Sequence, residues 1–338
     1  MLDLLVVGGG PVGLATALYA ARSGLAVGVV EPRAQPVDKA CGEGLMPGAI
    51  AALDDLGIAP QGRPFLGIRY TDGVHEATAD FRGAPGLGVR RTTLQASLAA
   101  AVTARGIPVH PRSVQRLEQD GHGVCAAGLR ARYLAAADGL HSPVRRLVGL
   151  AGRPSGRPRF GLRRHFAVEP WSDYVEVHWA RDREAYVTPV DDNCVGVALL
   201  TGRREPYDVQ LAHFPALRAR LPAVGASPVR GAGPLRQRTT ARVAGRVLLV
   251  GDAAGYVDAL TGEGIAVGVA SARALVDAVV SDDAASYERT WKSASRNYRW
   301  LTQLLLGARH QSAVAQLIVP AAQRLPRVFD AAVHQLAH

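Results

Sequence analysis

The N-terminal segment that ends at Glu31 constrains the fold most, because it combines an apolar run, a glycine-rich turn, a helical pattern and an acid. The apolar run Leu2 to Val7 is followed by Gly8-Gly9-Gly10-Pro11-Val12-Gly13 and then by helical spacing to Ala21. A second apolar run over 26–30 leads directly into the acid. This order predicts a strand, a turn, a helix and a second buried strand, which together form a βαβ unit.

The glycines of this unit suit a bound dinucleotide. Gly8 permits the tight turn, Gly10 lets the backbone approach a pyrophosphate, and Gly13 lets the helix pack closely on the strand. Free N–H groups at the helix N-terminus can bind phosphate oxygens. Glu31 can accept hydrogen bonds from ribose hydroxyls, and its charge disfavours a 2′-phosphate. We therefore expect FAD or NAD rather than NADP.

Composition limits the other function classes. The chain has 338 residues, of which 48% are hydrophobic and 20% charged, a globular composition of one large or two intergrown domains. Its 39 Lys+Arg and 29 Asp+Glu give a net charge of +10, but the arginines are scattered, so we expect no nucleic-acid partner. No apolar run approaches the ~20 residues that span a bilayer, so any membrane contact should be peripheral. The three cysteines lack CxxC spacing, which predicts no metal site and favours a cytoplasmic location.

Three further motifs follow along the chain. Arg91 opens an amphipathic helix that runs to Ala104, and Asp138-Gly139-Leu140-His141-Ser142-Pro143-Val144-Arg145 follows a predicted hairpin. A strand over 246–250 runs into Gly251-Asp252, after which Thr261-Gly262-Glu263-Gly264-Ile265 opens another helix. Alternating apolar residues between 160 and 200 predict an antiparallel sheet, and the chain is helical in pattern after residue 286. A second strand-GxGxxG-helix unit is missing, so a second resident nucleotide is not expected.

These motifs, in this order, resemble the flavoproteins typified by p-hydroxybenzoate hydroxylase. Within that group, Lys39-Ala40-Cys41-Gly42-Glu43-Gly44-Leu45 and the segment from Gly251 to Ile265 resemble the geranylgeranyl reductase family. Gly255 and Glu263 stand where aromatic hydroxylases usually carry His and Gln, which favours the reductase-like branch. The strand around Tyr186 keeps only part of the aromatic motif that geranylgeranyl reductases place against a lipid tail.

The resemblance implies an α/β fold in which a Rossmann-like FAD-binding domain is interrupted by an antiparallel substrate-binding sheet. We expect the FAD-binding domain to comprise residues 1–62, 88–156 and 236–285. The sheet domain should comprise 63–87 and 157–235, with C-terminal helices over 286–338.

The resemblance also implies FAD. Arg91 would hold the flavin phosphate or ribityl region, Val114 the adenine through its backbone, and Asp252 a ribityl hydroxyl. The helix that begins near Gly262 would stabilise negative charge on the flavin. The expected cofactor-binding residues are Gly8, Gly10, Pro11, Val12, Gly13, Glu31, Arg33, Arg91, Val114, Asp138, Gly139, Asp252, Gly262, Gly264 and Ile265.

The candidate catalytic residues are Cys41, Glu43 and Tyr186. In the family, the loop that contains the first two lies near the reacting edge of the flavin. A thiol there can donate a proton or simply pack, whereas a carboxylate buried in a cleft must find a partner or shift its pKa. Tyr186 and His165 are alternatives from the sheet, where a lone Tyr or His is commonly structural.

Three functions stay open from the sequence. The first is reduction of a carbon-carbon double bond in a hydrophobic small molecule by hydride transfer from flavin N5. The second is a monooxygenase that hydroxylates or epoxidises a hydrophobic or aromatic substrate through a C4a-hydroperoxide, and the third is a non-catalytic FAD-binding module. The electron donor is either NAD(P)H, bound transiently, or a separate flavin reductase. The seven arginines between Arg145 and Arg164 form either a solvated loop or a patch for an acidic carrier protein.

Overall fold

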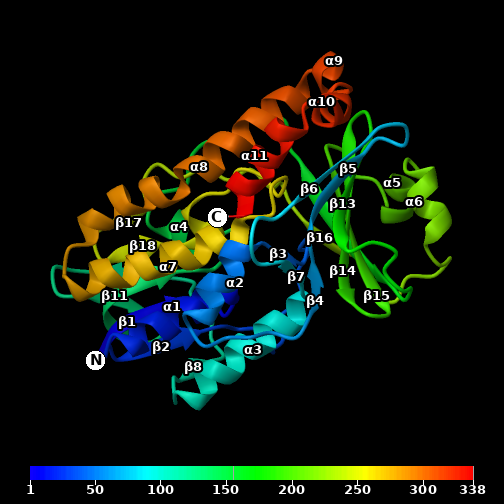
Figure 1. Ribbon diagram of the computed structural model, residues 1–338. Helices are drawn as coiled ribbons and strands as arrows, with labels where there is room; N and C mark the ends of the chain where they lie inside the picture. The colour runs from blue at the N-terminus through cyan, green and yellow to red at the C-terminus, as the bar shows by residue number, and fades with distance from the viewer. Residues whose placement is uncertain (155, 338) are drawn as a thin grey trace.

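The computed structural model describes residues 1–154 and 156–337, and it confirms the predicted α/β fold (Figure 1). Two large sheets stand side by side, with helices against the first sheet and a long C-terminal helix that runs from one sheet to the other. The first sheet has the strand order β17-β18-β11-β1-β2-β8, and the second β16-β12-β15-β14-β13-β5-β6. A three-stranded sheet, β3-β7-β4, lies between them.

The first sheet contains the predicted βαβ unit. Strand β1 (Leu2–Val7) pairs in parallel with β2 (Val27–Val30) and with β11 (Leu129–Ala136), and α1 (Pro11–Arg22) connects β1 to β2. The remaining strands of this sheet are β8 (Val109–His110), β9 (Leu117–Gln119), β10 (Val124–Ala126), β17 (Val243–Ala244) and β18 (Val247–Leu249). The predicted hairpin is β10 paired with β11. The carboxyl ends of β1, β11 and β18 therefore lie together, where the three glycine-containing motifs begin.

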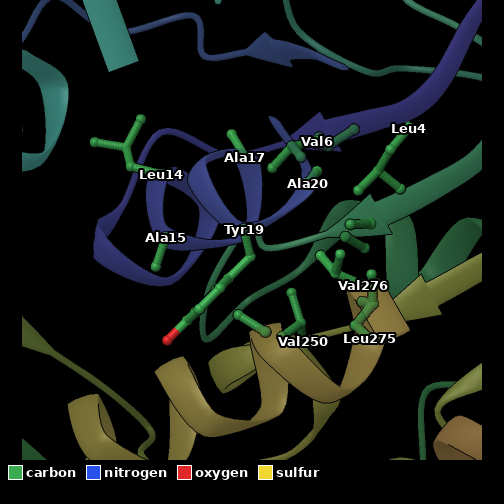
Figure 2. Packing of buried hydrophobic residues seen from close by; sticks show 14 of the residues in the cluster. Leu4, Val6, Leu14, Ala15, Ala17, Tyr19, Ala20, Val250, Leu275 and Val276 are labelled. Carbon is green, nitrogen blue, oxygen red and sulfur yellow. The ribbon is translucent and has the colours of Figure 1, made fainter. Parts of the chain in front are cut away.

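Helices cover this sheet and close the main hydrophobic core. They are α1, α3 (Arg91–Ala104), α4 (Pro143–Leu147) and α7 (Gly264–Val280), with the 3-10 helix η1 (Gly251–Ala254) after β18. Leu4 and Val6 of β1 pack with Leu14 of α1 and Leu275 of α7, all fully buried (Figure 2). A side chain at Gly268 would collide with Val12, so glycine here lets α7 approach α1 closely.

The second sheet is the predicted antiparallel one, with β5 added in parallel beside β13. Its strands are β5 (Gly67–Thr71), β6 (Glu76–Asp80), β12 (Phe160–Phe166), β13 (Tyr174–Trp179), β14 (Arg183–Asp191), β15 (Cys194–Thr201) and β16 (Arg230–Ala232). One face, which includes Val187 and Val197, packs beneath α5 (Tyr207–Leu211) and α6 (Pro215–Arg220). The opposite face carries Tyr186, Ala198 and Val177 in register across three strands.

The small sheet and the C-terminal helices complete the molecule. The small sheet comprises β3 (Gly44–Leu45), β4 (Arg63–Phe65) and β7 (Gly86–Gly88), and α2 (Pro47–Asp54) follows β3. The C-terminal helices are α8 (Ala284–His310), α9 (Ser312–Ala315), α10 (Ile318–Arg324) and α11 (Pro326–Ala337). Val319 and Phe329 bring α10 and α11 onto the edge of the second sheet. Among the described residues, no helix combines the length and the apolar character needed to cross a bilayer.

Candidate functional site

A large cavity of about 820 Å³ lies between the first sheet and the second. From the first sheet it is lined by the turn after β1, the segment after β11 and the segment after β18. From the second sheet it is lined by Val175, Val177, Tyr186, Ala198 and Leu200. The cavity therefore has a polar end beside the glycine motifs and an apolar end beside the second sheet.

The polar end is built on glycines that admit no side chain. Gly8 has a φ of 113°, and a Cβ there would collide with the carbonyl group of Ala137. A Cβ at Gly13 would collide with the carbonyl oxygen of Gly8. Gly10 lines the cavity together with Pro11 and Val12, whereas Gly8 and Gly13 lie behind them. The latter two glycines thus shape the turn and do not contact a ligand directly.

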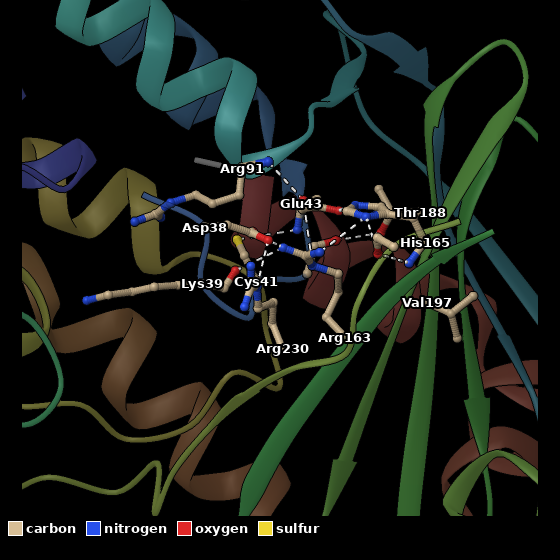
Figure 3. Close-up of polar contacts among 12 residues, drawn as sticks. Asp38, Lys39, Cys41, Glu43, Arg91, Arg163, His165, Thr188, Val197 and Arg230 are labelled. Atoms are coloured by element: carbon tan, nitrogen blue, oxygen red, sulfur yellow. Dashed lines mark hydrogen bonds and ion pairs between the residues drawn. The ribbon is translucent and has the colours of Figure 1, made fainter. Parts of the chain in front are cut away.

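Three cations line this end of the cavity, namely Arg33, Lys39 and Arg91. The Nε of Arg91 is buried and has no hydrogen-bond partner among the described residues. Burial, together with the nearby charges of Arg33 and Arg91, lowers the pKa of Lys39. Figure 3 shows the side chains of Lys39 and Arg91 extending away from the neighbouring polar cluster. A bound pyrophosphate would relieve the mutual repulsion of these cations.

Glu31 lies at the end of β2, as predicted, and is 2% exposed. Its Oε2 accepts hydrogen bonds from the N–H of Gly9 at 2.8 Å and from Nη2 of Arg33 at 2.8 Å. Its Oε1 accepts from the Nε of Arg33 at 2.7 Å. Despite burial, these donors lower the pKa of Glu31. Arg33 therefore covers the carboxylate on the cavity side, and ribose binding by Glu31 stays a prediction.

The remaining predicted cofactor residues lie at the cavity with one exception. Asp138, Gly139, Asp252, Gly262, Gly264 and Ile265 all line it. Val114 is buried in the core and is not part of the lining. Burial raises the pKa of Asp252, which faces Arg91, Lys39 and Arg145.

Arg145 links two of the motifs, a role that the sequence analysis missed. Its guanidinium donates to the carbonyl oxygens of Leu140 and Ala253, at 2.9 and 3.1 Å. Arg145 is 3% exposed, and Arg159 and Arg163 are also buried. The interpretation of all seven arginines between 145 and 164 as one solvated basic loop is therefore wrong for these three.

These observations fit FAD. The buried Nε of Arg91 and the buried Oδ1 of Asp138 both lack partners among the described residues and belong to residues that line the cavity. Glycines at the turn after β1 allow close backbone approach, and α7 begins at Gly264 on the cavity wall. A helix N-terminus in that position stabilises negative charge. The glycine turn and Arg91 thus suit the dinucleotide phosphates, and the N-terminus of α7 suits the flavin.

A polar cluster lies where the two sheets meet, with Glu43, Arg163 and His165 buried and Asp38 half-buried (Figure 3). Glu43 is 3% exposed and has a φ of 61°, in the left-handed region that L residues rarely adopt. Its Oε1 accepts a hydrogen bond from the N–H of Arg91 at 2.8 Å. Its Oε2 lies 2.6 Å from Nε2 of His165 on β12. The strained backbone thus aims the carboxylate at the second sheet while Glu43 still lines the cavity.

Arg163 holds this cluster together from β12. Its Nη2 donates to Oδ1 of Asp38 and to the carbonyl oxygen of Lys39, the latter at 3.2 Å. Its Nη1 lies 3.2 Å from Nδ1 of His165, and its Nε lies 3.8 Å from Oε1 of Glu43. Arg230 donates to the other oxygen of Asp38 at 2.9 Å. The cluster therefore ties the loop between β2 and β3 to the second sheet.

The other two predicted catalytic residues also line the cavity. Sγ of Cys41 accepts a hydrogen bond from the N–H of Glu43 at 3.4 Å, and burial raises the pKa of this thiol. The hydroxyl of Tyr186 donates to the carbonyl oxygen of Leu260 at 3.0 Å, and burial raises its pKa well above 10. Cys41 and Glu43 thus lie together, whereas the Tyr186 hydroxyl is bonded to the segment before α7.

Comparison with known proteins supports the assignment. Residues 1–192 match the family model described as FAD binding domain. A menaquinone reductase from Mycobacterium tuberculosis is 28% identical, with 86% of this chain and 79% of that protein covered. A protoasukamycin 4-monooxygenase from Streptomyces nodosus subsp. asukaensis is 30% identical, with 85% of this chain and 82% of that protein covered.

A solved structure shows the same fold. The flavoprotein/dehydrogenase from Cytophaga hutchinsonii superimposes with a TM-score of 0.87 at 17% identity, over 99% of this chain and 92% of that one. The resemblance to the p-hydroxybenzoate hydroxylase superfamily that the motifs predicted is confirmed. Because the family model matches more than half of its length, this chain belongs to the FAD binding domain family and is an FAD-dependent oxidoreductase.

Proposed function

We propose that the protein reduces a carbon-carbon double bond of a hydrophobic small molecule. The observation that carries this proposal is a buried acid on the cavity wall: Glu43, whose carboxylate is hydrogen-bonded to His165. Hydride addition to a double bond leaves a carbon or oxygen atom that must take a proton, and a positioned carboxyl group can supply it. The flavin supplies the hydride when bound.

The apolar end of the cavity supports a hydrophobic substrate. Ile68, Val175, Val177, Ala198 and Leu200 line it from three strands of the second sheet, β5, β13 and β15, on the face opposite α5 and α6. The polar part of the same sheet face is on β12, which lies between β16 and β15 and carries Arg163 and His165. A substrate that lies across this face has its apolar part over β13 and β5 and its reacting part beside Glu43.

The two residues of the Cys41–Glu43 loop differ in what they can contribute. Glu43 already exchanges a hydrogen bond with His165 and is our first choice as proton donor. The raised pKa of the Cys41 thiol keeps it protonated at neutral pH, so it can pack against the flavin edge or serve as a weaker donor. Tyr186 positions the segment before α7 through the hydrogen bond from its hydroxyl to the Leu260 carbonyl oxygen.

The second candidate function is monooxygenation, favoured by the similarity to protoasukamycin 4-monooxygenase. Two residues argue for the reductase. Gly255 and Glu263 stand at the positions where aromatic hydroxylases usually carry His and Gln, and both follow β18 near the cavity. The similarity to menaquinone reductase supports the same choice.

The electron donor and the location complete the proposal. NAD(P)H reduces the flavin from a transient site, because the described residues contain one glycine-rich βαβ unit and FAD takes it. A separate flavin reductase is the alternative donor. The location is the cytoplasm, and the substrate is a hydrophobic molecule met there or at a membrane surface.

A half-reaction tests the proposal without the natural donor. The bound flavin is reduced with dithionite under nitrogen, freed of excess dithionite and mixed with menaquinone carrying two isoprene units. Because the quinone ring can itself oxidise a reduced flavin, the rate is followed by mass spectrometry as saturation of a side-chain double bond. We expect saturation by the wild-type protein and a rate at least about a hundredfold lower in Glu43→Gln. Equal rates in both proteins would remove Glu43 from the reaction.

A further inference from the structure

We propose that His165 is a proton-relay and positioning residue, which connects Glu43 in the cavity to solvent through Ser227. This inference rests on the proposed function, because it explains how the proton donor is recharged. The chain of contacts starts at Oε2 of Glu43, passes through both ring nitrogens of His165 and ends at Oγ of Ser227.

On the side of the second sheet, the inner half of the relay is closed to water. Glu43 and His165 are 3% and 2% exposed, and their contact of 2.6 Å joins the loop before β3 to β12. A Cβ at Gly196 on β15 would lie 2.8 Å from Oε2 of Glu43, so the strand behind the pair leaves no room for a water molecule there. On the side away from the cavity, His165 is therefore the group that can return a proton to Glu43.

The outer half of the relay reaches the surface. Nδ1 of His165 lies 3.0 Å from Oγ of Ser227, and the backbone N–H of His165 donates to the same oxygen at 3.0 Å. The serine hydroxyl also donates to the Pro228 carbonyl oxygen, at 3.3 Å. Ser227 is half-buried in the segment between α6 and β16, where both neighbouring residues are exposed. Its hydroxyl is thus held against the ring on one side and is near solvent on the other.

The charged groups around the ring set its resting state. Arg163 Nη1 lies 3.2 Å from Nδ1, and an arginine N–H can only donate. Donation to Nδ1 leaves the ring proton on Nε2, facing Glu43. Asp38 compensates the charge of Arg163 and is itself held by Arg230. Cys41 and Cys194 are further titratable groups near Glu43.

The proton balance of one turnover is simple. Glu43 gives its proton to the substrate as the hydride arrives from the reduced flavin. Nε2 of His165 then gives its proton to Glu43, while Nδ1 takes one from Ser227 Oγ, which takes one from water. One hydride from the flavin and one proton from solvent have then been added to the double bond, and Glu43 is protonated again. The ring proton is now on Nδ1, and a half-turn of the ring about its Cβ–Cγ bond returns a protonated nitrogen to the side of Glu43 before the next turnover.

The sheet supplies a matched control for a purely structural Glu–His pair. Glu176 and His178 lie on β13 with Oε2 and Nε2 3.2 Å apart, on the sheet face opposite the cavity. Neither residue lines the cavity. His178→Gln therefore removes a histidine of the same sheet and the same pairing type without touching the proposed path.

The first experiment measures the relay itself and needs no turnover. In the FAD-loaded protein labelled with ¹⁵N-histidine, the His165 ring signals are assigned by their loss in His165→Gln. We expect a proton on Nε2 at rest, and exchange of that proton with solvent at least about tenfold slower in Ser227→Ala. His178→Gln should leave the His165 signals unchanged. A ring proton on Nδ1 alone, or the same exchange rate in Ser227→Ala, would overturn the relay.

The second experiment adds the catalytic readout with dithionite-reduced protein and menaquinone carrying two isoprene units. We expect Ser227→Ala to lower the limiting rate and raise its solvent deuterium isotope effect, with the concentration of quinone needed for half-saturation unchanged. His165→Gln should lower the rate about a hundredfold. The rate is read as saturation of a side-chain double bond, because the quinone ring can itself oxidise the flavin. A wild-type protein that saturates no side-chain double bond contradicts the proposed function, and the ring signals then decide the relay alone. Saturation that is equally fast in wild type and both variants overturns the relay.

Discussion

At the scale of single residues, the glycines of the first turn show what sequence can predict. Their roles follow from a motif whose spacing is fixed by the geometry of a turn, and the structure gives Gly8 and Gly13 the contacts that the motif requires. Glu43 differs, because the sequence marks a buried acid but not its partner. His165 lies 122 positions away, and only the fold brings the two together.

Replacement of Gly13 tests the turn. We expect Gly13→Ala to abolish retention of FAD through gel filtration, because the new methyl group collides with the Gly8 carbonyl oxygen and must displace the turn. Gly121→Ala is the control, since a Cβ there meets no atom within 4 Å. Full flavin content in Gly13→Ala would show that the turn does not hold the pyrophosphate.

Gly196→Ala tests the Glu43–His165 contact without removing an ionisable group. The added Cβ would lie 2.8 Å from Glu43 Oε2, too close for an unshifted carboxylate. We expect the variant to bind FAD normally but to reoxidise with the quinone about tenfold more slowly, because proton transfer depends on this hydrogen bond. Gly202→Ala, whose nearest contact is at 3.7 Å, should match the wild type. Equal rates in both variants would argue against proton transfer through this contact.

At the scale of elements, α7 carries an unusual acid at its start. Glu263 precedes the first turn, is 8% exposed, and has an Oε2 without a hydrogen-bond partner among the described residues. Burial raises its pKa from 4.5 to about 7. The folded protein therefore binds this proton more tightly than the unfolded chain, and the resulting stability is lost as the pH rises from 4.5 towards 7.

The pH dependence of unfolding tests this assignment. The pKa difference corresponds to about 3 kcal/mol of unfolding free energy lost between pH 4.5 and pH 8. We expect Glu263→Gln to unfold at a higher denaturant concentration than the wild type at pH 8 and to show a flatter pH profile. Parallel profiles of the two proteins from pH 5 to pH 8 would contradict a buried, neutral Glu263.

At the scale of the whole molecule, a second buried charge network joins the C-terminal helices to the cavity. Arg309 of α8 binds Glu184 of β14, which also binds Arg159 at 2.7 Å. Arg159 in turn lies 3.0 Å from Asp258, in the segment that leads to α7. The network thus connects the last helices, the second sheet and the segment bound by Tyr186.

Loss of one partner in this network should be costly. Arg309→Leu leaves the Ala180 and Arg181 carbonyl oxygens without a donor and removes one cation from Glu184. We expect about 3 kcal/mol less unfolding free energy in a urea titration. Lys292→Ala, which removes an exposed i,i+4 pair with Glu288, should cost about 0.5 kcal/mol or less. Similar losses in both variants would show that the buried network does not lock the helices.

The difference between local patterns and contacts with distant segments explains how much could be predicted from sequence. The first sheet, the antiparallel sheet and most of the cavity lining follow from local patterns, because periodicity and turn chemistry act over a few residues. Arg145, Arg159 and Arg163 looked like a solvated run because their partners come from distant segments. The exact domain boundaries stay a prediction, as do the individual cofactor contacts.

The mass of the product tests the central claim most directly. Dithionite-reduced protein, freed of excess dithionite, is mixed with menaquinone carrying two isoprene units, once under nitrogen and once in air, and the quinone is recovered for mass spectrometry. We predict a product heavier by two hydrogen atoms in a side-chain double bond, formed under nitrogen and depending on Glu43. A product heavier by one oxygen atom, formed only in air, would contradict the reductase and assign the protein to the monooxygenases.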